Sequence, residues 1–160
     1  MFGLTTLGLI HTVISLVAIV SGAIALVRDH RITLGNSVGR LFVLSMVLTC
    51  VTGFGFFGTN SAVTKGQTLG FITIAVIVVA YLAERRHAFG GASAAVATVG
   101  WSAVFFFNMI PFFAQTLTRL PSGKPVFADD TAQGLAVINA VMFILFLIGA
   151  YLQVRKLRRG

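Results

Sequence analysis

Residues 132–159 read AQGLAVINAVMFILFLIGAYLQVRKLRR, a long apolar run that ends in a cluster of basic side chains. A helix needs about 20 mainly apolar residues to cross a bilayer, and this run is long enough. Four similar runs precede it. The sequence therefore predicts an all-α integral membrane bundle of five transmembrane helices, over residues 4–27, 38–58, 68–83, 92–117 and 132–154.

The composition agrees with this class of protein. Of the 160 residues, 57% are hydrophobic and only 10% are charged, whereas soluble domains carry about 25% charged residues. The five spans leave only short connections, so we expect one transmembrane domain over residues 1–160. The chain contains no G-x-S-x-G, P-loop or dinucleotide-binding motif, and we therefore expect no autonomous enzyme.

The basic residues predict the orientation of the chain. Nine of its twelve lysines and arginines fall in the loops and tail on one side of the predicted bundle. The positive-inside rule then places the amino terminus outside and the carboxyl terminus in the cytoplasm of a bacterial inner membrane. Despite the net charge of +8, these helix-end cations are expected to contact lipid head groups rather than nucleic acid, at Arg28, Arg31, Arg85, Arg86, Arg155, Lys156, Arg158 and Arg159.

The few acidic residues are expected at the ends of the spans. Asp29 and Glu84 fall beside arginines on the predicted inner surface, and Asp129 or Asp130 is placed to cap the fifth helix. No carboxylate is expected at mid-membrane, which argues against a carboxylate-driven proton pump or cation carrier. The single cysteine, Cys50, excludes an internal disulfide and gives no metal-binding spacing.

A short internal similarity suggests two related hairpins followed by a fifth helix. TLGLI at 6–10 resembles TLGFI at 68–72, and each helix then reaches a cluster of acidic, basic and histidine residues, at 29–31 and 84–87. Short apolar matches also arise by chance, so duplication and coincidence both remain open.

Neutral polar side chains gather at similar depth in the predicted outer half, together with many phenylalanines. One interpretation is structural, because Asn, Gln, Ser and Thr hydrogen-bond between membrane helices. The functional interpretation is a cavity for a hydrophobic ligand with carbonyl or hydroxyl groups, such as a quinone, a carotenoid or a lipid. The residues expected to bind this ligand are His11, Trp101, Asn108, Gln115 and Asn139.

The three histidines are the candidate ligands for a haem or a metal ion. A haem in a helical bundle needs two axial imidazoles at similar depth. His30 and His87 both lie at the predicted cytoplasmic boundary, where they could hold one haem or simply face solvent and lipid. His11 has no histidine partner on its side, which excludes a two-haem arrangement, and no metal site is expected.

The His11 helix, His30-Arg31 and Gly39-Arg40 together resemble a broad family of uncharacterised bacterial multi-pass inner-membrane proteins. That family is itself reminiscent of cytochrome b561-like bundles. The resemblance covers roughly residues 5–60 and implies a bacterial membrane protein rather than a defined activity.

Three functions remain open at this point. The leading hypothesis is an inner-membrane subunit or binding module that holds a hydrophobic ligand in its outer-leaflet half, in association with electron transport. The alternatives are a small oligomeric transporter or channel for a neutral solute, and an accessory structural subunit without a ligand. Expected partners are membrane lipids and either other membrane subunits or further copies of the chain.

The distribution of polar residues separates a transporter from a binding module. A permeation path predicts polar helix faces through both leaflets, whereas a ligand pocket is closed at one end by apolar side chains.

Overall fold

The computed structural model describes residues 6–55, 64–120, 124–129 and 131–159. Within these ranges the chain forms five long helices and no strand: α1 (Thr6–Asp29), α2 (Ser37–Phe54), α3 (Lys65–Arg86), α4 (Ser93–Arg119) and α5 (Gln133–Leu157), with a short 3₁₀ turn, η2 (Gly90–Ala92), before α4. Each long helix has the length and apolar composition needed to cross a membrane. The predicted all-helical architecture with five such helices is confirmed.

Side-chain caps, which hydropathy does not register, set the beginnings of two helices. Asn36 caps α2, because its Oδ1 accepts a hydrogen bond from the backbone N–H of Gly39 at 2.8 Å. Thr64 and Gln67 form a reciprocal capping box at the start of α3. The third helix therefore starts at Lys65, ahead of the expected position 68. The expected ends at residues 4 and 58 lie outside the described residues.

The expected acidic cap of α5 is absent at Asp129. Ala132 occupies the N-cap position and makes no side-chain capping bond. Asp129 instead accepts hydrogen bonds from the hydroxyl and backbone N–H of Thr131, at 2.5 and 2.8 Å, and these bonds lower the pKa of its carboxyl group. Asp130 lies outside the described residues.

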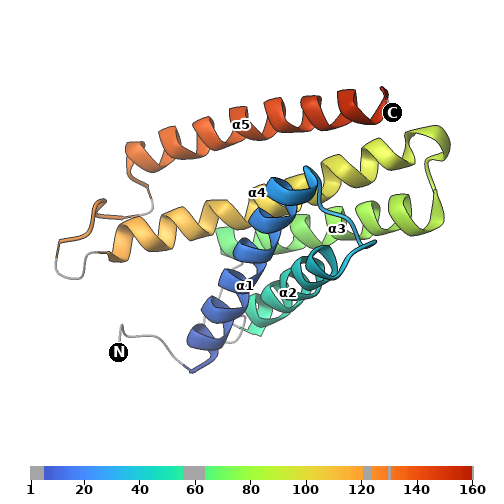
Figure 1. Cartoon of the computed structure of the whole chain (residues 1–160). Coiled ribbons are helices and arrows are strands. Elements are labelled where there is room, and N and C mark those ends of the chain that lie inside the picture. The colour runs from blue at the N-terminus through green and yellow to red at the C-terminus, as the bar shows by residue number, and fades with distance from the viewer. Residues whose placement is uncertain (1–5, 56–63, 121–123, 130, 160) are drawn as a thin grey trace.

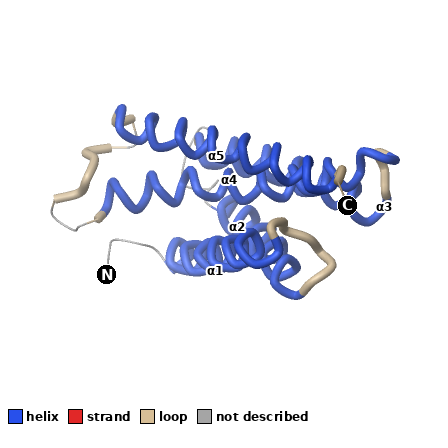
Figure 2. Tube along the Cα trace, turned by 45° about the horizontal axis from the view of Figure 1, so that its top comes forward, coloured by secondary structure: helices blue, strands red, loops and turns tan. Residues whose placement is uncertain are grey.

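The helices are arranged as two hairpins and one further helix (Figure 1). α1 packs against α2, α3 packs against α4, and α5 packs along α4. Figure 2 shows α5 and α4 running together, with α1 and α2 on one side of them. This is the arrangement that the internal similarity suggests, while a common origin of the hairpins stays a prediction.

Small residues let the helices approach closely where they cross. A Cβ atom on Gly22 would lie 2.5 Å from the Phe105 ring and 2.9 Å from the Phe42 ring. A Cβ on Gly100 would lie 2.9 Å from the Cβ of Ala80. Such small-residue contacts are the usual means of packing membrane helices. α5 is different, because Leu135 is its only buried residue and most of its apolar side chains face outward.

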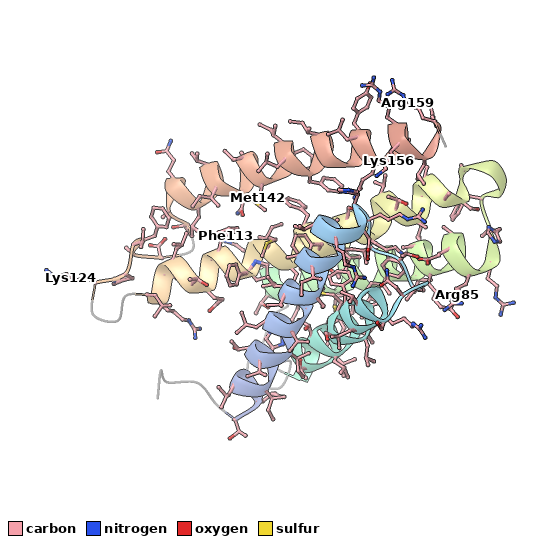
Figure 3. All side chains as sticks on the ribbon, viewed as in Figure 1. Arg85, Phe113, Lys124, Met142, Lys156 and Arg159 are labelled. Carbon is pink, nitrogen blue, oxygen red and sulfur yellow. The ribbon has the colours of Figure 1, made fainter. Side chains whose placement is uncertain are left out.

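The basic residues gather at one end of the bundle, which we call the arginine end. It comprises the α1–α2 loop, the α3–α4 turn and the carboxyl terminus of α5. Figure 3 shows Arg85, Lys156 and Arg159 at this end and Lys124 at the opposite one. All eight residues expected at lipid head groups have exposed side chains: Arg28, Arg31, Arg85, Arg86, Arg155, Lys156, Arg158 and Arg159.

Candidate functional site

A cavity of about 180 Å³ lies between α1, α4 and α5, and extends from the middle of the bundle toward the arginine end. We call it the apolar cavity. Its lining is mainly aromatic and aliphatic, and consists of Leu26, Ser102, Phe105, Phe106, Met142, Leu145, Phe146, Gly149, Ala150 and Gln153.

Phenylalanine contacts between α4 and α5 build the walls of the apolar cavity. The rings of Phe106 and Phe146 stack with centroids 5.4 Å apart and planes 16° apart. Phe105 contacts Phe42 of α2, with ring centroids 6.2 Å apart. Apart from the chain neighbours of Gly149 and the backbone of its own helix, no atom lies within 4 Å of the position where its Cβ would stand, so Gly149 borders open space.

Two polar side chains close the end of the apolar cavity nearest the arginine end. The Ser102 hydroxyl donates to Oε1 of Gln153 at 2.9 Å, and Nε2 of Gln153 donates to the backbone carbonyl of His30 at 2.9 Å. A glutamine amide carries two N–H donors, and a serine hydroxyl keeps acceptor capacity when it donates. This end can therefore hydrogen-bond a carbonyl or hydroxyl group of a bound molecule.

A second cavity of about 180 Å³ lies at the arginine end, between the α1–α2 loop, α3 and α4. We call it the polar cavity. Its lining includes charged and hydroxyl side chains, and consists of Arg31, Ile32, Thr33, Ala83, Glu84, His87, Ala94, Ala97 and Thr98.

Glu84 of α3 connects the two hairpins beside the polar cavity. Its Oε1 accepts from the Thr33 hydroxyl at 2.6 Å and from the backbone N–H of Leu34 at 2.7 Å. Its Oε2 accepts from Nε1 of Trp101 at 2.5 Å, and Trp101 is fully buried. Glu84 thus reaches into the bundle, whereas the sequence placed it among the arginines on the surface.

Three of the five residues expected to bind a ligand form hydrogen-bonding contacts between helices. Nδ1 of His11 lies 2.9 Å from the Thr52 hydroxyl of α2. Nδ2 of Asn108 donates to the backbone carbonyl of Ser15 in α1 at 3.3 Å, and Trp101 donates to Glu84. These bonds are of the kind that the structural interpretation predicts.

The other two expected ligand residues lie toward the outside of the bundle. Gln115 is exposed and Asn139 is half-buried. None of the five lines the apolar cavity or the polar cavity. A ligand site formed by these five residues in the outer half stays a prediction.

His30 and His87 both adopt a left-handed backbone conformation directly after a helix, with φ of 58° and 49°. His87 caps the end of α3 and lines the polar cavity, while the His30 carbonyl accepts from Gln153. One haem held by both histidines stays a prediction. Within the described ranges, no three His, Cys, Asp or Glu side chains are arranged to hold a metal ion.

Sequence reasoning missed Glu84, Ser102 and Gln153, although helical spacing indicates two of them. Glu84 continues the buried row Thr73, Ile77 and Ala80 of α3, and Gln153 continues the row Met142, Phe146 and Gly149 of α5. Both rows follow the i, i+4, i+7, i+11 spacing of one helix face. Both polar residues stand near the ends of apolar runs, where hydropathy alone gives no sign that a side chain turns into the bundle.

Comparisons with protein-family models, with curated protein sequences and with solved structures find no match to this chain.

Proposed function

We propose that the protein is a multi-pass binding module of the bacterial inner membrane that holds a hydrophobic ligand in the apolar cavity. The observation that carries this proposal is the combination of phenylalanine walls with a single polar end at Ser102 and Gln153. Sites for hydrophobic ligands commonly pair mainly apolar walls with a few polar groups that fix the orientation. In the predicted orientation the amino terminus is outside, and the ligand lies in the middle and cytoplasmic half of the membrane.

Among quinones, carotenoids and lipids, a quinone matches the lining best. Its ring stacks on aromatic side chains such as Phe106 and Phe146, whose rings already stack on each other. Its carbonyl oxygen accepts the second N–H of Gln153, whose first N–H is bound to the His30 carbonyl. A role in electron transport follows from this ligand class.

The test fills the apolar cavity from a position that tolerates added volume. Wild type, Gly149→Leu and Gly149→Ala are purified gently from native membranes, and their lipophilic contents are measured by mass spectrometry and ultraviolet-visible absorption. We expect wild type and Gly149→Ala to retain a quinone in a fixed ratio to protein. We expect Gly149→Leu to lose it, because the larger side chain enters the open space beside Gly149.

The same spectra separate the competing functions. Equal retention in Gly149→Leu contradicts binding in the apolar cavity. Bulk phospholipid alone in all three samples favours a transporter or an accessory structural subunit. A Soret band favours a haem bound at His30 and His87.

A further inference from the structure

The Glu84 carboxylate has no basic partner among the described residues, although it reaches toward the interior. Its three donors are the Thr33 hydroxyl, the Leu34 backbone N–H and the Trp101 indole, all of which are neutral groups. Within the described ranges, the one acidic side chain with a basic group within 4 Å is Asp29, paired with Arg28. A partly buried carboxylate without a counter-charge favours the binding of a cation.

The geometry of Glu84 leaves room for one further donor. A carboxylate offers about four lone-pair positions, two on each oxygen. Oε1 accepts two hydrogen bonds and Oε2 accepts one, from Trp101. The one lone-pair position that remains is on Oε2. Glu84 is among the residues that line the polar cavity. An ammonium group in this cavity can donate to it.

Two nitrogen-bearing side chains that can donate hydrogen bonds line the same cavity. Arg31 comes from the α1–α2 loop and His87 from the end of α3, and both are exposed while Glu84 is half-buried. A guanidinium group binds phosphate through two parallel hydrogen bonds. The cavity therefore presents a carboxylate on its inner side and basic groups toward the surface.

We propose that the polar cavity binds a primary amine linked to a phosphate, with the amine on Glu84 and the phosphate on Arg31 and His87. Phosphoethanolamine has this chemistry, either as the head group of a phospholipid or as the free compound. The surrounding exposed arginines place the cavity at the expected level of lipid head groups. This site is separate from the apolar cavity and does not depend on the proposed function.

Trp101 supplies a direct readout, because it is the single tryptophan of the chain and its Nε1 donates to Glu84. The purified full-length protein in detergent is titrated with short-chain phosphatidylethanolamine, phosphatidylcholine, phosphatidylglycerol and free phosphoethanolamine, while tryptophan emission is recorded. We expect a saturable change with phosphatidylethanolamine. Phosphatidylcholine has no N–H on its amine and phosphatidylglycerol has no amine, so both should bind at least about tenfold more weakly.

Variants test the two sides of the cavity separately. Arg31→Gln should weaken phosphatidylethanolamine binding at least about tenfold, since it removes a charged donor to phosphate. Arg86→Gln is the matched control, because Arg86 is exposed nearby but does not line the cavity. Glu84→Gln should remove the preference for the primary amine. If Glu84→Gln does not fold, the wild-type lipid comparison and Arg31→Gln still decide the matter.

Each outcome of the titration has a defined meaning. Equal affinity for phosphatidylethanolamine and phosphatidylcholine, no saturable change, or unchanged binding by Arg31→Gln would overturn the proposal. Tight binding of the phospholipid but not of free phosphoethanolamine supports it and assigns the ligand to the membrane. Equally tight binding of free phosphoethanolamine supports the same chemistry with a soluble ligand.

Discussion

Replacing Trp101 by phenylalanine tests how much the bond between Trp101 of α4 and Glu84 of α3 stabilises the α3–α4 hairpin. Hydrogen bonds to charged groups contribute about 1.5–3 kcal/mol in soluble proteins, and bonds between membrane helices reach about 1.7 kcal/mol. Because Trp101 is 0% exposed and its bond to Glu84 is 2.5 Å long, we expect a loss of about 1.5–2 kcal/mol from this bond. The smaller ring adds a packing loss of about 1 kcal/mol.

Glu84→Gln perturbs the same bond from the other side. A glutamine amide has one oxygen, so it cannot accept from Thr33, Leu34 and Trp101 together in the present arrangement. An unsatisfied buried donor costs about 1–3 kcal/mol, and we expect a loss of this size. Each single variant removes the bond between Trp101 and Glu84, and the double variant can lose it only once. The loss in the double variant should therefore be smaller than the sum of the two single losses by a coupling free energy of about 1–2 kcal/mol.

Reversible unfolding in sodium dodecyl sulfate, followed by circular dichroism, measures the free energy of unfolding for the four proteins of this cycle. Arg85→Gln is the control, because an exposed substitution should change stability by less than about 0.5 kcal/mol. The reasoning is refuted if the loss in the double variant equals the sum of the two single losses to within about 0.5 kcal/mol. It is also refuted if each single loss is no larger than that of the control.

Further predictions concern packing, capping and orientation. Gly100→Ala should lower the free energy of unfolding by about 1–3 kcal/mol, because its Cβ would lie 2.9 Å from that of Ala80, whereas Gly149→Ala should leave it unchanged; unfolding in detergent compares the two. Asn36→Ala should cost about 0.5–2 kcal/mol in the same assay, because it removes the α2 cap and the 2.9 Å hydrogen bond from Nδ2 of Asn36 to Oδ2 of Asp29. A green fluorescent protein fused to the carboxyl terminus should fluoresce and alkaline phosphatase fused there should be inactive, and the reverse pattern would contradict the predicted orientation.

The number of long helices follows from hydropathy because each span must satisfy its backbone hydrogen bonds internally and present apolar side chains outward. The helix beginnings follow from local chemistry instead, as Asn36 and the Thr64–Gln67 pair demonstrate. Capping signals of this kind are visible in a sequence when they are sought.

The location of a cavity was harder to predict, because depth along a helix does not determine which neighbour a side chain meets. Trp101 and Asn108 are seven residues apart and share a face of α4. Trp101 nevertheless reaches Glu84 of α3, whereas Asn108 reaches Ser15 of α1. The α1–α2 hairpin crosses the α3–α4 hairpin, so one helix face meets different helices along its length (Figure 1).

An electron cryomicroscopy map of the protein from its native membrane, with a bound antibody fragment to add mass, tests the central claim most directly. Our account predicts non-protein density between α1, α4 and α5, stacked near Phe106 and in contact with Ser102 or Gln153. A cavity filled by collapsed side chains, or bound density confined to the opposite end near His11 and Gln115, would contradict it.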